Sequence, residues 1–124
     1  MLNPSKTVEI FQIQSGPHSF AKGETIFKEG EEGEVMYGIL EGEVELLINN
    51  RAVETILTGD VFGEGALVDP QRLHSSTAIA KTDCKLAALN MERFLFVVQE
   101  TPEFALNVMR SLSNRLRHLK HSDD

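Results

Sequence analysis

The segment from Phe20 to Ile48 reads FAKGETIFKEGEEGEVMYGILEGEVELLI and predicts an all-β unit. Short runs of β-branched and other apolar residues alternate in it with single glycines. This spacing is typical of short antiparallel strands joined by tight turns, because glycine adopts the backbone conformations that such turns require. The pattern continues as far as Asn90, and the glycines that carry it are Gly23, Gly30, Gly33, Gly38, Gly42, Gly59, Gly63 and Gly65.

The pattern predicts a mainly β fold, an antiparallel β-roll similar to a jelly roll. The expected strands are short, and their number suits a roll or a sandwich. In Val44–Ile48 the two-residue alternation is incomplete, so we expect both faces of this strand to be buried. The expected strands are Ser19–Ala21, Thr25–Phe27, Val35–Glu41, Val44–Ile48, Glu54–Leu57, Ser76–Ala80 and Lys85–Leu89.

Two helices are expected after the roll. Asn90 is placed to cap a helix over Met91–Glu100, and Thr101 is placed to cap a second helix that begins with Pro102. Apolar residues of the second helix recur every three or four positions and form one stripe. We expect its first half to pack on the roll and its second half to form a homodimer seam. The stripe is Phe104, Val108, Leu112, Leu116 and Leu119, and the seam is expected at Val108, Leu112, Leu116 and Leu119.

The length of 124 residues favours one domain with a single core. No segment rich in Pro, Gly or Ser divides the sequence. We therefore expect a single domain over residues 1–124, with the roll at about 14–90 and the C-terminal helices at about 91–120. At the other end, Pro4–Ile13 predicts a short helix with Val8 and Phe11 buried.

The composition excludes several classes of protein. The net charge of −7 argues against nucleic acid as the main partner, although residues 102–121 carry four bases and one acid. We expect those bases to complement the dipole at a helix C-terminus, and a patch for a phosphate or an acidic partner is the alternative. Cys84 is the only cysteine, which rules out an intramolecular disulfide and a cysteine metal cluster. The sequence lacks a membrane-spanning apolar run and a signal-peptide pattern, so we expect a cytoplasmic protein.

Residues 59–67, GDVFGEGAL, form a segment whose residues indicate a ligand site, and we call it the cassette. Gly63 and Gly65 allow the backbone to approach a ligand, and Ala66 can begin a helical turn whose free N–H groups favour an anion. Glu64 places a carboxylate among these donors, which does not suit a simple phosphate site. A ligand with both a phosphate and a hydroxyl fits, because Glu64 can accept a hydrogen bond from the hydroxyl. A cyclic nucleotide has both groups.

The sequence resembles the cyclic-nucleotide-binding domain family, which includes the cyclic-AMP receptor protein, protein kinase regulatory subunits and nucleotide-gated channels. The resemblance covers nearly the whole chain: the segment from Phe20 to Ile48, the cassette and the terminal pair of helices. It implies a β-roll with a nucleotide site walled by the cassette. It also implies a C-terminal helix that moves over the site when the ligand binds.

The resemblance further implies the residues of the site. Glu64 matches the family's glutamate for the ribose 2′-hydroxyl, and Gly63 and Ala66 match positions whose backbone amides lie close to the ligand. His74 stands at the position of the arginine that pairs with the cyclic phosphate in the bacterial regulators. The expected ligand-binding residues are Phe62, Gly63, Glu64, Gly65, Ala66, His74, Ser75 and Ser76.

His74 in place of arginine is the main departure from the family pattern. Losing a charge-assisted hydrogen bond of about 1.5–3 kcal/mol would weaken a phosphate ligand by roughly tenfold to a hundredfold or more. Arg72 lies two residues earlier and would need a different loop path to replace it. Gly65 stands where the family usually has an apolar side chain. Leu119 and Lys120 stand where the family has hydroxyl side chains that contact the purine.

Two functions are consistent with these residues. The first is a non-enzymatic sensor domain that binds cyclic AMP, cyclic GMP or a related small anion and signals to a partner protein through its C-terminal helix. The second is a degenerate module that no longer binds nucleotide and acts by protein contact. We expect no metal or other cofactor, because the histidines lack the spacing of a metal motif and no P-loop or catalytic triad is visible. The sequence ends before any helix-turn-helix, so we expect no operator binding unless a separate DNA-binding chain cooperates with it.

Overall fold

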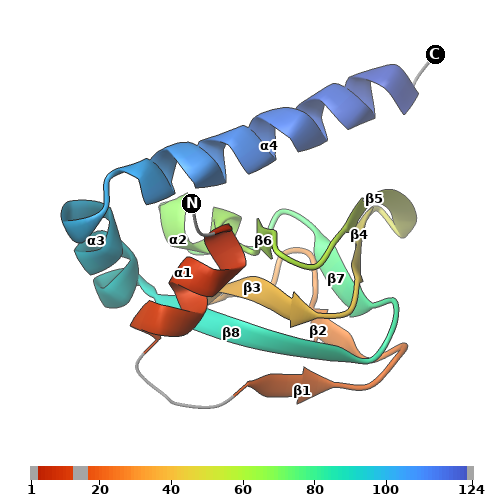
Figure 1. Cartoon of the computed structure of the whole chain (residues 1–124). Coiled ribbons are helices and arrows are strands. Elements are labelled where there is room, and N and C mark those ends of the chain that lie inside the picture. The colour runs from red at the N-terminus through yellow and green to blue at the C-terminus, as the bar shows by residue number, and fades with distance from the viewer. Residues whose placement is uncertain (1–2, 13–16, 123–124) are drawn as a thin grey trace.

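A computed structural model of the chain describes residues 3–12 and 17–122 (Figure 1). Its elements are α1 (Pro4–Phe11), β1 (His18–Phe20), β2 (Thr25–Phe27), β3 (Val35–Glu41), β4 (Val44–Ile48), β5 (Arg51–Ile56), β6 (Val61–Phe62), α2 (Gly65–Val68), β7 (Thr77–Ala80), β8 (Cys84–Asn90), α3 (Met91–Glu100) and α4 (Glu103–Ser122). The strands form two antiparallel sheets with the orders β1-β8-β3-β6 and β2-β7-β4-β5. The expected mainly β roll with flanking helices is confirmed.

The strands differ from the expected ones mainly at their ends. β5 begins at Arg51 rather than Glu54, because Asn49 and Asn50 have positive φ angles of 53° and 64° and form a tight turn after β4. Asparagine tolerates this conformation, which two-residue hairpin turns require. β6 was not expected, since two residues are too few to show a period.

The two sheets enclose one part of the core, and the helices cover the outer face of the β1-β8-β3-β6 sheet (Figure 1). β3 is therefore buried on both faces: Ile39 packs between the sheets and Met36 packs under the helices, each 0% exposed. The expectation of two buried faces for β4 was wrong. Val44 and Leu46 are buried, but Leu47 is only half-buried because no helix lies on the outer face of that sheet.

The short helices begin as their sequences predict. Asn3 Oδ1 accepts a hydrogen bond from the N–H of Lys6 at 3.0 Å, and Asn90 Oδ1 accepts one from Arg93 at 2.9 Å. α1 buries Val8 completely, and Phe11 is partly buried against the helix-side core. The helix expected over Pro4–Ile13 was too long, because α1 ends at Phe11 and Gln12 has extended backbone angles (φ −66°, ψ 147°); Ile13 lies outside the described residues.

α4 crosses above the roll and continues beyond it toward the C-terminus (Figure 1). It begins at Glu103, and the N–H of Phe104 donates to the carbonyl of Thr101 at 3.0 Å. Its apolar residues do not form one stripe. Phe104 and Val108 are 1% and 6% exposed in the core, whereas Leu116 is 69% exposed. Steps of four residues advance about 40° around a helix, so the stripe drifts from the buried face to the open one. In the described ranges, no helix is long and apolar enough to span a membrane.

Candidate functional site

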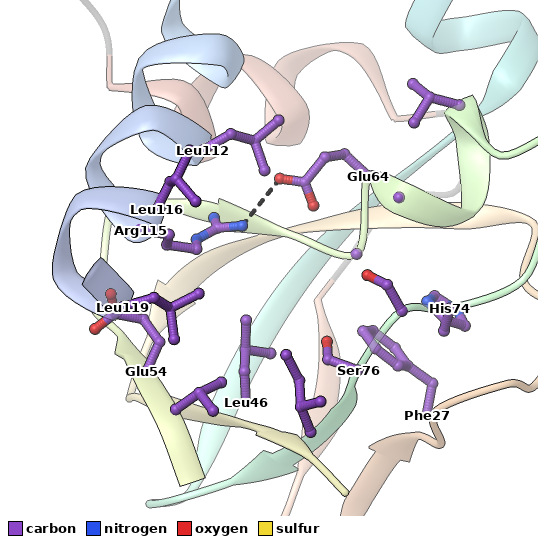
Figure 2. Close-up of a pocket in the computed structure, with 16 residues that line it drawn as sticks. Phe27, Leu46, Glu54, Glu64, His74, Ser76, Leu112, Arg115, Leu116 and Leu119 are labelled. Carbon is purple, nitrogen blue, oxygen red and sulfur yellow. Dashed lines mark hydrogen bonds and ion pairs between the residues drawn. The ribbon is translucent and has the colours of Figure 1, made fainter. Parts of the chain in front are cut away.

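A cavity of about 350 Å³ lies between the roll and α4, with the cassette at one end (Figure 2). Most of the residues expected at the site line this cavity. Phe62 and Ala66 do not, and both are 0% exposed. The expected residues that line it are Gly63, Glu64, Gly65, His74, Ser75 and Ser76.

The turn at Gly63 positions Glu64. β6 ends at Phe62, and Gly63 follows with a φ of 81°, a conformation that other residues rarely adopt. A Cβ at Gly63 would also lie 3.2 Å from the Phe27 ring, so both the backbone and the space favour glycine. The Glu64 side chain then points toward α4 across the end of the cavity (Figure 2), with 5% of the residue exposed.

Arg115 of α4 is the partner of Glu64, although it was not among the expected site residues. Its Nη1 donates to Glu64 Oε1 at 3.0 Å, and the two side chains are 12% and 7% exposed. Its Nη2 donates to the carbonyl of Val61 and to Ser111 Oγ, the latter at 2.8 Å. A carboxylate so far removed from water needs an opposing charge, and Arg115 supplies it from the helix that covers the cavity.

The sequence holds a signal for this pair. Arg115 lies on the same face of α4 as the buried residues Phe104 and Val108, eleven and seven positions earlier. Arginine is rarely buried unless it is paired, so an arginine on the buried face of a helix predicts a buried acid opposite it. Glu64 is the cassette residue that fits this requirement.

His74 lines the cavity, but its ring belongs to the wall. The ring stacks on Phe27 with centroids 3.6 Å apart and 7° between the planes. On the Gly33 side, a Cβ built on that glycine would lie 2.2 Å from His74 Nε2, so only glycine leaves room for the ring. Burial lowers the pKa of His74, against an opposing effect of Glu31. The imidazole is therefore neutral near pH 7 and presents no permanent charge to a phosphate.

Arg72 does not replace the missing arginine. It has a positive φ of 59° and lines a separate hollow with Glu31 and Glu32, on the other side of His74. Arg115 is the one lysine or arginine among the described residues that line the cavity beneath α4, and its charge is balanced by Glu64. Ser75 and Ser76 supply hydroxyl groups at this end.

The end of the cavity away from the cassette is apolar. Leu46 of β4 and Val53 of β5 line it. Figure 2 shows Leu112, Leu116 and Leu119 of α4 across the cavity from Leu46. Glu54 stands at its edge, and its Oε2 lies 2.7 Å from Nδ1 of His118 on α4, within hydrogen-bond distance. Leu119 lines the cavity where the family pattern has a purine-contacting hydroxyl, and Lys120 is exposed.

The cavity holds no evident metal site. Among residues 3–12 and 17–120, no three His, Cys, Asp or Glu side chains come together in a way that could hold a metal ion. Carboxylate, guanidinium and hydroxyl groups at one end, with aliphatic side chains at the other, suit an organic ligand that carries a polar end and a flat or apolar end.

Comparison with known proteins identifies the family. The model of the cyclic nucleotide-binding domain matches residues 17–101, and the chain therefore belongs to this family. The cAMP-activated global transcriptional regulator CRP of Pasteurella multocida is 29% identical over 117 residues, which cover 90% of this chain and 56% of that protein. The CRP-like cAMP-activated global transcriptional regulator of Mycobacterium tuberculosis is 32% identical over 117 residues, covering 88% of this chain and 50% of the relative.

Solved structures agree with this assignment. The catabolite activator protein of Thermus thermophilus superposes with a TM-score of 0.76 at 28% identity, covering 94% of this chain and 55% of that chain. A cAMP-bound PfPKA-R structure gives a TM-score of 0.72 at 27% identity, covering 86% of this chain and 36% of that one. The chain thus spans about half the length of the curated relatives that it matches.

Proposed function

We propose that this chain is a non-enzymatic regulatory domain that binds a cyclic nucleotide, or a related small anion, in the cavity beneath α4. The observation that carries the proposal is that the two carboxylate oxygens of Glu64 differ in their partners. Its Oε1 accepts from Arg115 of α4, and no described residue donates to its Oε2. One carboxylate therefore touches the signalling helix and keeps an acceptor for a ligand hydroxyl.

The rest of the cavity suits the other parts of such a ligand. Ser75 and Ser76 offer hydroxyl donors near the cassette, where the phosphate would lie. The base would lie between the floor of the roll and the leucines of α4, held by apolar contact. Because α4 forms part of the wall, occupancy changes how firmly this helix is seated, and a partner protein can detect that change.

Calorimetric titration with cyclic AMP and cyclic GMP tests the proposal. We expect saturable binding, weakened about tenfold or more by Glu64→Gln, since glutamine keeps the size but removes the charged acceptor. Glu45→Gln is the matched control, because Glu45 lies on β4 outside the cavity. No binding of either nucleotide at millimolar concentration, or equal affinity in Glu64→Gln, would contradict the proposal.

A second candidate function is an interaction module that has lost nucleotide binding. The observation in its favour is the buried, neutral His74 ring, which leaves the phosphate end of the cavity without an unbalanced positive charge. In that case the same titration shows no binding of either nucleotide, while α4 still associates with a partner or with a second copy of itself.

For both functions we propose a homodimer as the assembled form. The expected seam needs one change. Val108 is buried in the core of the domain, so we assign its place in the seam to Met109, which is 56% exposed. Ala105, Met109, Leu112, Leu116 and Leu119 follow one another at steps of four, three, four and three residues. That spacing is the repeat of paired helices, so the occupant of this face is a second copy of α4.

A further inference from the structure

A buried polar cluster fastens α4 to the cassette. It consists of Asp60, Glu64, Ser111 and Arg115, and we call it the α4 polar cluster. Ser111 Oγ donates to Asp60 Oδ1 at 2.6 Å, and Arg115 donates to Ser111 Oγ at 2.8 Å and to Glu64 Oε1 at 3.0 Å. Ser111 is 7% exposed and Glu64 is 5% exposed, while Asp60 and Arg115 are half-buried, so these bonds are partly shielded from water.

The direction of each hydrogen bond in the cluster is fixed. A serine hydroxyl has one proton, and Ser111 gives it to Asp60, so its lone pairs are left for Arg115. Asp60 Oδ1 is itself held by the N–H of Val61 at 2.8 Å, at the start of β6. The chain of donors and acceptors therefore runs from the backbone of β6 through Asp60 and Ser111 to the guanidinium.

The position of Arg115 depends on this support. Its Nη2 is directed by Ser111 and by the carbonyl of Val61, while its Nε is buried with no partner among the described residues. Burying Nε without a hydrogen-bond partner costs free energy, and fixing one rotamer of a long side chain costs entropy. The other hydrogen bonds of Arg115 must offset both costs to hold it in this position. Without Ser111, the guanidinium would keep only its bonds to Glu64 and to the carbonyl of Val61.

We propose that Ser111 and Asp60 are positioning residues that fix the Arg115 guanidinium on Glu64 and so hold α4 closed over the cavity. The part of this inference that concerns signalling rests on the proposed function: a ligand at Glu64 would act on α4 through this cluster. The seating of α4 by Ser111 and Asp60 does not depend on which ligand binds.

Hydrogen exchange of α4 in the full chain without nucleotide tests the seating. Ser111→Ala should make the amides around Arg115 exchange about fivefold faster or more, because the cluster loses its central member. Ser113→Ala is the matched control on the same helix, at an exposed position. Alanine has a higher helix propensity than serine, so an effect of helix propensity alone would slow exchange in both variants. Ser111→Thr keeps the hydroxyl and should restore slow exchange.

A double-mutant cycle with cyclic AMP as the probe tests the link to the site. Ser111→Ala should weaken binding severalfold in the wild-type background and have little further effect in Glu64→Gln, since it acts through Glu64. If Ser111→Ala exchanges like Ser113→Ala, the inference is overturned whether or not nucleotide binds. If exchange changes as expected but the wild type does not bind cyclic AMP, the seating role stands and the role in signalling fails together with the proposed function.

Discussion

In the proposed complex His74 stands near the nucleotide phosphate, and its ring is held in the wall between Phe27 and Gly33. We expect His74→Arg to strengthen cyclic AMP binding by about tenfold or more, because a long guanidinium can leave the wall and form charge-assisted bonds in the cavity. Titration calorimetry measures the change. Arg72→Ala, in the neighbouring hollow, should leave affinity as it is. Equal binding by His74→Arg and wild type would show that no phosphate lies near position 74.

The same residue makes stability depend on pH. Burial lowers the pKa of His74 in the folded state below the ordinary value of 6.5. Below about pH 6.5 the unfolded chain therefore binds more protons at this site, and the free energy of unfolding falls as the pH falls toward the folded-state pKa. Urea unfolding at several pH values should show a steeper loss for wild type than for His74→Gln. Parallel curves for the two proteins would exclude a contribution from His74.

Among the helices, α3 offers the clearest local test. Asn90 satisfies the N–H of Arg93 at 2.9 Å at the start of this helix, whose Val97 is fully buried. Replacing Asn90 with alanine removes the cap and should lower the free energy of unfolding by about 1 kcal/mol. Urea denaturation measures this loss, and Gln99→Ala, at an exposed position of the same helix, serves as the control. An unchanged midpoint for Asn90→Ala would mean that water caps the helix equally well.

The elements also show what the sequence could and could not predict. Strand periods, turn glycines and the Asn90 cap are local signals, and each was predicted near its place. The burial of β3 on both faces was not, because it depends on which sheet the helices cover. Glu64 was found through the cassette and His74 through the resemblance to the family. Arg115 is fifty-one positions from Glu64: its place on the buried face of α4 indicates a buried acid partner, and the fold shows that this partner is Glu64.

One face of α4, which includes Leu116 at the edge of the cavity, carries apolar side chains that are largely exposed. Met109 is 56% exposed and Leu116 is 69% exposed, on the face whose spacing matches paired helices. Leu106 is 54% exposed on the same helix but lies off that repeat. A second copy of α4 would cover Met109 and Leu116 together and leave Leu106 in water.

This difference makes a matched pair of variants possible. We expect Met109→Glu to convert the dimer into a monomer in sedimentation equilibrium, because it places a charge in the apolar seam of each copy. Leu106→Glu introduces the same charge at nearly the same exposure and should remain dimeric. Neither residue lines the cavity, so both variants should keep the ligand site intact. A dimer that survives Met109→Glu, or is lost equally in Leu106→Glu, would place the contact on another surface, and α4 would then be open to a different partner protein.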